Sequence, residues 1–269
     1  MKTILIDLTR CNGCYNCQIA CKDEHVDNDW SPVARPQPDT GQFWMKVENR
    51  ERGIYPKVKV AYIPLLCQHC ENAACISAAN DKAVYRRHDG IVIIDPDKSR
   101  GQRELVGSCP YGAIFWNEEL QIPQKCTFCA HLLDNGWKEP RCVEACPTDA
   151  LVYGEHNELM KIAQERGRKV ELLKPELDLK PSILYIGLPK RFIAGTVLFA
   201  DMNECAEHVT VNLVGKSIEK SILTNNYGDF EFEDLDSNQN FTIVVEHNGY
   251  AVKRFQVETD NDILSLIHI

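Results

Sequence analysis

The sequence predicts an α+β protein with a cysteine-rich part over residues 1–190 and a small all-β part over residues 191–269. Three observations support this division. Twelve of the 13 cysteines lie between Cys11 and Cys146. Short β-prone runs at regular spacing fill the chain beyond residue 190, as is typical of a small antiparallel sandwich. Residues 168–190 contain three prolines and predict an extended strap between the two parts, and a length of 269 residues suits about two domains.

The cysteines of the first part fall into four motifs, two of them complete. The first motif has the spacing C-x2-C-x2-C-x3-C, which bacterial ferredoxins use to bind cubane 4Fe–4S clusters. In such loops three thiolates of a motif bind one cluster, and the fourth binds a neighbouring cluster. Zinc also binds paired C-x2-C loops, but it needs neither a further cysteine three residues on nor an isolated Cys-Pro pair. We therefore predict a duplicated bacterial-ferredoxin-like domain.

Two internal repeats indicate a plan of four complete motifs. An apolar run that ends in aspartate stands four residues before Cys11, and a similar run stands four residues before Ser99. A Cys-Pro pair followed by a β-prone segment occurs at both Cys109 and Cys146. The residues that stand where cysteines are missing from this plan are Ala79, Ser99, Gln102 and Leu105.

Counting decides which motifs share clusters. Pairing the first motif with the second, or with the third, leaves cysteines without a complete set of four. Only the nested scheme, first with fourth and second with third, uses all twelve, and it predicts three 4Fe–4S clusters. The ligand sets are set A (Cys11, Cys14, Cys17, Cys146), set B (Cys21, Cys126, Cys129, Cys142) and set C (Cys67, Cys70, Cys75, Cys109). The four missing ligands form the complete set of a lost fourth cluster.

The connections between the motifs give three further expectations. Residues 22–66 are too long for a simple connection, and their aromatic side chains favour an ordered, partner-facing segment over disorder. Arg87–Gly90, between two β-prone runs, predicts a hairpin turn. Residues 155–166 predict an amphipathic helix that ends at Gly167.

The second part predicts a seven-stranded β-sandwich. Apolar and polar residues alternate in several of its runs, and polar turns separate them. Cys205 lies far from every motif and predicts a solvated or structural cysteine. The seven runs are Phe192–Phe199, Val209–Val214, Ser217–Leu223, Asp229–Glu233, Phe241–Glu246, Ala251–Val257 and Ile263–Ile267.

Composition limits the compartment and the partners. The formal net charge of −9, with no basic stripe, argues against nucleic-acid binding. No apolar run reaches the roughly 18 residues that span a membrane, and residues 1–7 show no export signal. Reduced metal-binding thiols then predict a cytoplasmic protein. A partner with an export signal could still carry the chain across a membrane.

A few single residues have two interpretations each. His69 and His131 adjoin cluster loops, but twelve thiolates already satisfy three clusters, so hydrogen bonding or packing is expected of both. Lys125 precedes Cys126 and could raise the reduction potential of a cluster, or it could be an ordinary solvated lysine. None of the common hydrolase, zinc-protease or nucleotide-binding motifs is present, and no catalytic residue is predicted in this chain.

The nested motifs resemble those of the iron–sulfur subunits of the DMSO reductase family of molybdopterin oxidoreductases. Residues 1–190 carry the resemblance, with Cys109–Gly112 (Cys-Pro-Tyr-Gly) and Lys125–Cys129 (Lys-Cys-Thr-Phe-Cys) as specific phrases. The loss of one cluster together with a β-sandwich tail is similar to the small subunits of transhydroxylases in that family. The tail itself resembles Cna-B/transthyretin-like sandwiches through residues 224–232.

The resemblance implies a large partner subunit that holds molybdenum on two pterin guanine dinucleotides and contains the active site. The cluster of set A would lie nearest that cofactor. The lost cluster would be the distal one, which faces a quinone-side subunit in membrane-linked relatives, so no membrane subunit is expected. The implied function is electron transfer for a redox-neutral hydroxyl transfer between polyhydroxybenzenes. The alternatives are a reductive catechol-dehydroxylase-type enzyme and a stand-alone polyferredoxin-like carrier.

Overall fold

A computed structural model describes residues 1–269 of the chain. Strands dominate, with five short α-helices. The chain forms two compact units. The first comprises Met1–Asn49 and Tyr62–Leu188, and the second comprises Arg50–Ala61 and Pro189–Ile269. No helix of the chain has both the length and the apolar character that a membrane crossing requires.

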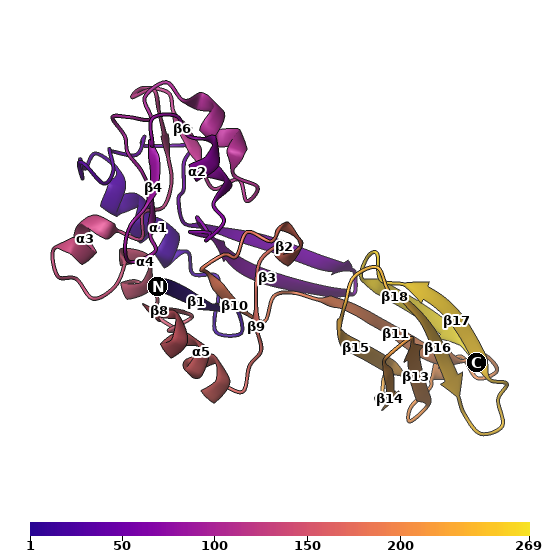
Figure 1. Ribbon diagram of the computed structural model, residues 1–269. Helices are drawn as coiled ribbons and strands as arrows, with labels where there is room; N and C mark the ends of the chain where they lie inside the picture. The colour runs from indigo at the N-terminus through magenta and orange to yellow at the C-terminus, as the bar shows by residue number, and fades with distance from the viewer. The chain divides into compact units, whose positions relative to one another are not determined.

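The first unit contains a four-stranded sheet in the order β8-β1-β10-β9 (Figure 1). β1 runs antiparallel to β8 and parallel to β10. Its residues 4–6 are fully buried, as expected of a central strand that is covered on both faces. The bounds are β1 Lys2–Asp7, β8 Leu151–Glu155, β9 Val170–Glu171 and β10 Leu184–Ile186.

Helix α5 (His156–Glu165) covers this sheet and confirms the predicted amphipathic helix. Its Leu159 and Ala163 pack against apolar side chains of β1 and β10. The helix begins with a capping box, in which Glu155 and Glu158 each accept a hydrogen bond from the other's backbone. The sequence therefore determines both the buried face and the start of this helix.

Part of residues 168–190, expected as an extended strap, instead forms regular structure. β10 lies inside the sheet, and Ile183, Leu184, Tyr185 and Ile186 are buried. This short apolar run is bracketed by prolines, which is why its composition suggested a linker. The prediction of a continuous strap is wrong for this stretch.

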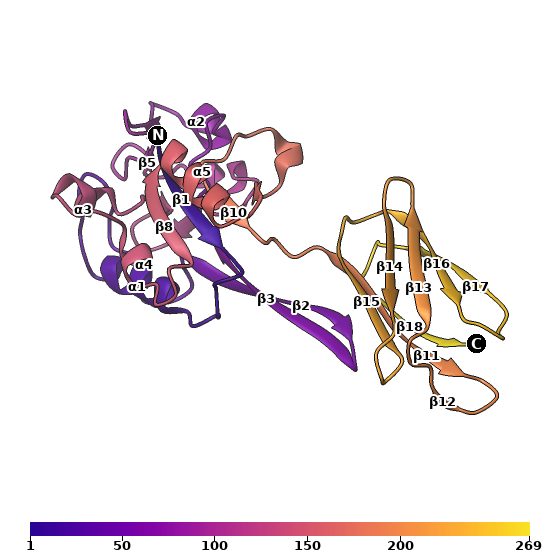
Figure 2. The same cartoon turned by 90° about the horizontal axis from the view of Figure 1, so that it is seen from below.

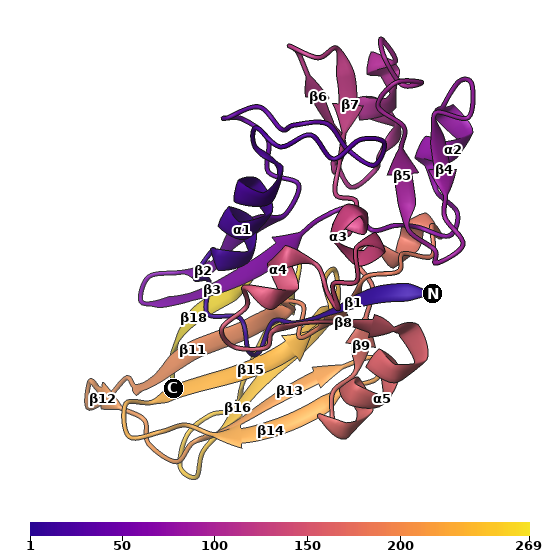
Figure 3. The same cartoon turned by 90° about the vertical axis from the view of Figure 1, so that its left-hand side faces the viewer.

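Short elements carry the cysteine motifs of the first unit. The hairpin β4–β5 confirms the predicted turn at Arg87–Gly90, and helix α2 contacts β4 (Figure 3). Asp7 and Asp95 accept the backbone N–H two residues on, at 3.1 and 3.0 Å, so the two halves of the sequence repeat begin with the same turn. The bounds are α1 Asn16–His25, α2 Ala74–Ala78, β4 Val84–Arg86, β5 Val92–Ile94, η1 Arg103–Ser108, β6 Phe115–Asn117, β7 Ile122–Gln124, α3 Ala130–Asp134, α4 Arg141–Glu144 and η2 Pro175–Leu177.

Residues 22–66 are ordered and contain a hairpin that the sequence did not predict. Its strands are β2 (Lys46–Ile54) and β3 (Lys57–Leu65). Most of β2 is charged and at least partly exposed, so the alternation that marks a half-buried strand is weak. The tip of this hairpin, residues 50–61, belongs to the second unit.

The second unit confirms all seven predicted strands as β11 and β13–β18, and β12 is a short addition. They form two sheets, one built around β11 with β12, β15 and β18, the other in the order β14-β13-β16-β17 (Figure 2). Both sheets contribute buried residues to one apolar core, including Ile193, Phe230, Leu213 and Ile243. The unit is therefore a small β-sandwich. The bounds are β11 Arg191–Phe199, β12 Glu204–Cys205, β13 Thr210–Gly215, β14 Glu219–Leu223, β15 Asp229–Leu235, β16 Asn240–Glu246, β17 Lys253–Glu258 and β18 Ile263–His268.

Candidate iron–sulfur cluster sites

Three cysteine loops share one backbone conformation. In the first C-x2-C pair of each loop the residue before the second cysteine has a positive φ: 69° at Gly13, 43° at His69 and 53° at Phe128. The backbone N–H groups of His69 and Phe128 point at the sulfur of the preceding Cys67 and Cys126, at 3.5 and 3.4 Å. Each of these two loops thus folds tightly around a sulfur and offers it a hydrogen bond, which suits a metal-bound thiolate.

The thiols of set A lie close together. Burial raises the pKa of Cys17 to about 12, and the nearby Cys11, Cys146 and Cys14 add to this rise. Cys146 follows α4, whereas the other three precede or begin α1. The contact between α1 and α4 brings these two ends of the motif series together.

Set B is the most deeply buried set. The pKa of Cys142 lies well above its ordinary value because of burial, and then because of Cys129, Cys21 and Cys126. All four of these side chains are less than a tenth exposed. Two histidines support this set from outside. His25 Nδ1 lies 2.8 Å from the carbonyl oxygen of Cys21, while His131 Nε2 bonds Glu24 at 2.9 Å.

Set C surrounds a cavity. Cys67, Cys70, Cys75 and Cys109 all line one space beside α2. The pKa of Cys70 is raised to about 12, mainly by burial and then by the other three thiols of the set. His69 and Lys125 also line the wall of this cavity.

The three sets form a series. Burial and the other members of set B raise the pKa of Cys142, and Cys17 of set A adds to that rise. Burial likewise raises the pKa of Cys126 in set B, and the nearby Cys67 of set C raises it further. Thiols of set B therefore have neighbours in both set A and set C.

Beside set C lie the four residues predicted to stand where a fourth ligand set is missing, Ala79, Ser99, Gln102 and Leu105, which we call the plug. Leu105 is fully buried, and Ala79 packs in the same apolar cluster. Gln102 Oε1 accepts the backbone N–H of Asn80 at 3.0 Å, and its amide nitrogen donates to the carbonyl of Lys98 at 2.8 Å. Ser99 is also fully buried. The four residues predicted to replace cysteines thus fill one region with protein atoms.

The donor chemistry fits iron–sulfur clusters. All 13 cysteines are free thiols, the four of set C line one cavity, and thiols within set A and within set B raise one another's pKa; such soft sulfur donors suit iron–sulfur clusters. Cys205 stands apart on β12, where it is exposed, in agreement with its expected solvated role. His69 and His131 are both buried and hydrogen-bonded, as expected. Lys125 is only 2% exposed, so its interpretation as a solvated lysine is wrong.

Comparison with known proteins identifies relatives along the whole chain. The pyrogallol hydroxytransferase small subunit of Pelobacter acidigallici is 40% identical over 273 residues, covering 97% of this chain and 96% of that protein. This chain belongs to the family of that small subunit. Its residues 58–156 also match the family model described as a 4Fe-4S dicluster domain.

Other relatives of this iron–sulfur subunit match a smaller share of the chain. A subunit of the tetrathionate reductase of Salmonella typhimurium is 33% identical over 71% of this chain and 74% of that protein. A subunit of the anaerobic dimethyl sulfoxide reductase of Escherichia coli is 33% identical over 66% of this chain and 87% of that protein. A solved structure, Klebsiella pneumoniae 5-hydroxyisourate hydrolase, matches 29% of this chain and 88% of its own length with 14% identity. Its TM-score of 0.27 is too low to support an argument about the fold.

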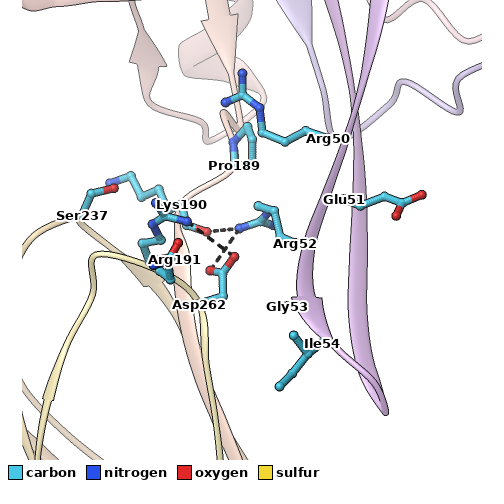
Figure 4. A pocket seen from close by; sticks show the side chains of 11 residues that line it. Arg50, Glu51, Arg52, Gly53, Ile54, Pro189, Lys190, Arg191, Ser237 and Asp262 are labelled. Atoms are coloured by element: carbon cyan, nitrogen blue, oxygen red, sulfur yellow. Dashed lines mark hydrogen bonds and ion pairs between the residues drawn. The ribbon is translucent and has the colours of Figure 1, made fainter.

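The second unit of this iron–sulfur subunit has a polar pocket of about 470 Å³ near the hairpin tip (Figure 4). Arg52 of the tip donates to the backbone carbonyl of Lys190, and its guanidinium lies 4.0 Å from the carboxylate of Asp262. Arg191 approaches the same carboxylate at 3.7 Å. The charges in this pocket therefore join the hairpin tip to β11 and to the turn before β18.

Proposed function

We propose that this chain is the electron-transfer subunit of a pyrogallol hydroxytransferase, a molybdopterin transhydroxylase. Sets A, B and C would each hold one 4Fe–4S cluster through four thiolates, and each cluster, when bound, supplies a one-electron store. The similarity to the Pelobacter small subunit extends over both parts of the chain, and this is the observation that carries the proposal. The reacting molybdenum centre, on two pterin guanine dinucleotides, would belong to a large partner subunit.

The plug favours a redox-neutral reaction over a respiratory one. A series of clusters in sets A, B and C would end near Leu105 and Gln102, two packed side chains at positions predicted for a missing fourth donor set. A subunit that transferred electrons to or from a membrane would need a redox centre at the far end of its series of clusters. Transfer of a hydroxyl group between two polyhydroxybenzenes consumes no electrons overall and needs no such exit.

The remaining parts of the chain complete this proposal. Residues 22–66 would face the large subunit, and the β-sandwich, of Cna-B/transthyretin-like type, would stabilise the complex. A cytoplasmic location fits the reduced thiols that cluster assembly requires. No quinone-side membrane subunit is proposed.

A reductive enzyme is the second candidate. The relatives from tetrathionate reductase and dimethyl sulfoxide reductase share 33% identity with this chain, so the same clusters could serve a reductase of the catechol-dehydroxylase type. Such an enzyme would draw its electrons from a soluble donor.

One assay separates the two candidates. The native complex, purified without oxygen, is given pyrogallol and a tetrahydroxybenzene co-substrate, with and without a reduced dye. Formation of phloroglucinol without the dye supports transhydroxylation. Turnover that requires the dye supports the reductase, and the absence of both activities contradicts the proposed function.

A further inference from the structure

Three buried polar side chains line the cavity of set C with its four thiols, and the amide nitrogen of one of them, Gln68, already donates to the carbonyl of Leu66 and to the hydroxyl of Tyr185. His69 and Lys125 both line this cavity, and they are 1% and 2% exposed. Neither touches bulk water, so each must find its hydrogen-bond partners inside the protein or in whatever fills the cavity.

The ring of His69 is fixed in one tautomer. Its Nδ1 accepts the backbone N–H of Val92 at 3.0 Å, so in the neutral ring the hydrogen is on Nε2. Because Nδ1 accepts this hydrogen bond, it carries no hydrogen of its own, and the ring is neutral. Phe128 packs against it at a centroid distance of 3.9 Å. Nε2 is buried and has no partner among the protein atoms.

Lys125 places a positive charge between two sets. Its ammonium donates to the backbone carbonyls of Val92 and Cys126, the latter at 3.0 Å. An ammonium has three donors, so one N–H remains for the cavity. Lys125 lines the same cavity as the four thiols of set C.

At the position equivalent to His69, the other two sets have no side-chain donor. The residue before the second cysteine of the pair is Gly13 in set A, His69 in set C and Phe128 in set B. Glycine has no side chain, and phenylalanine has no hydrogen-bond donor. The same loop conformation thus carries a side-chain N–H only at set C.

We propose that His69 Nε2–H and Lys125 donate hydrogen bonds to sulfur atoms of the cluster held by set C, and that this cluster consequently has the highest reduction potential of the three. Reduction adds negative charge to a cluster, and both an N–H dipole and an ammonium stabilise that charge. Electrons in this chain would then rest at set C, next to the plug. This inference rests on the proposed binding of three clusters.

Two substitutions test it. His69→Asn can keep an acceptor for the N–H of Val92 through its side-chain oxygen and tolerates the positive φ of 43°, but it removes the Nε2 donor. Lys125→Gln keeps a donor and removes the charge. Lys138→Gln, an exposed lysine, is the matched control.

The native complex of each variant is titrated electrochemically with EPR detection. For each of the two cavity variants we expect the equilibrium constant for reduction of the set C cluster to fall at least tenfold, about 59 mV for one electron. The set A cluster and the control should not change. Unchanged set C potentials in both cavity variants would overturn the inference.

Two further measurements keep the outcomes distinct. Iron and sulfide analysis of the wild type tests the proposed function, because fewer than three clusters would refute the parent proposal and leave potentials undefined. Pulsed EPR of the reduced wild type labelled with ¹⁵N-histidine needs no variant. It should show a nitrogen coupling at the highest-potential cluster that His69→Asn removes. A missing coupling, with three clusters present, refutes only the role of His69.

Discussion

Replacing Leu105 with alanine should open the set C site. The Leu105 side chain is fully buried and belongs to the apolar cluster that also includes Cys75 and Cys109. Truncating a fully buried leucine to alanine costs about 3–5 kcal/mol, because transfer and cavity terms add. Each 1.4 kcal/mol changes an equilibrium tenfold, so the population of locally open protein should rise at least about a hundredfold.

Iron release to a chelator under anaerobic conditions measures this opening. About one third of the iron should leave Leu105→Ala roughly a hundredfold faster than wild type, while the rest leaves at the slower rate. Leu105→Met, which nearly conserves volume, should cost less than about 1.5 kcal/mol and release iron much more slowly. Leu223→Ala, at a leucine that is 58% exposed, serves as the surface control. Equal release from Leu105→Ala and wild type would show that the plug does not support set C.

Three further predictions concern other parts of the chain. Cys146→Ser should remove about one third of the iron if set A holds one of three clusters, and unchanged iron would exclude Cys146 as a ligand. Burial alone would raise the pKa of Glu231, but its pairing with Lys57 and Lys59 of the hairpin tip holds that pKa below its ordinary value of 4.5. The stability that this pair contributes is therefore complete above pH 4.5 and is lost as the pH falls further. The melting temperature of Glu231→Gln should accordingly fall less than that of the wild type as the pH is lowered below 4.5. An equal fall in both proteins would argue against the pair. Gly228→Ala should destabilise the sandwich far more than Gly249→Ala. Both glycines have positive φ, but only at Gly228 would the new methyl lie 2.3 Å from the carbonyl oxygen of Val197, and equal melting temperatures would refute the clash.

The sequence predicts best where local patterns and covalent spacing decide the structure. The strands of the sandwich follow alternation, as at Phe230 and Phe232, which both point into the core. The grouping of the twelve thiols into three sets follows from counting, because each cysteine needs a complete set. The ligand assignment itself stays a prediction.

Other features depend on tertiary context that no local pattern encodes. The hairpin β2–β3 has charged, partly exposed strands, and β10 is a three-residue strand flanked by prolines. The burial of Lys125 is equally invisible in the sequence, since a lysine beside a cysteine is ordinary at a protein surface. Only the fold shows that two backbone carbonyls hold its ammonium inside the protein.

The packing of the plug is consistent with the predicted loss of one cluster without loss of the fold. A missing cluster would leave a void and, around it, backbone N–H groups without sulfur acceptors, and both are costly when buried. The side chain of Leu105 fills apolar volume that would otherwise be a void, and Gln102 accepts a hydrogen bond from the backbone N–H of Asn80. A glutamine alone would leave the void, and a leucine alone would leave the donor unpaired. Leu105 and Gln102 therefore complement each other, and restoring a single cysteine among the four positions should not restore a cluster.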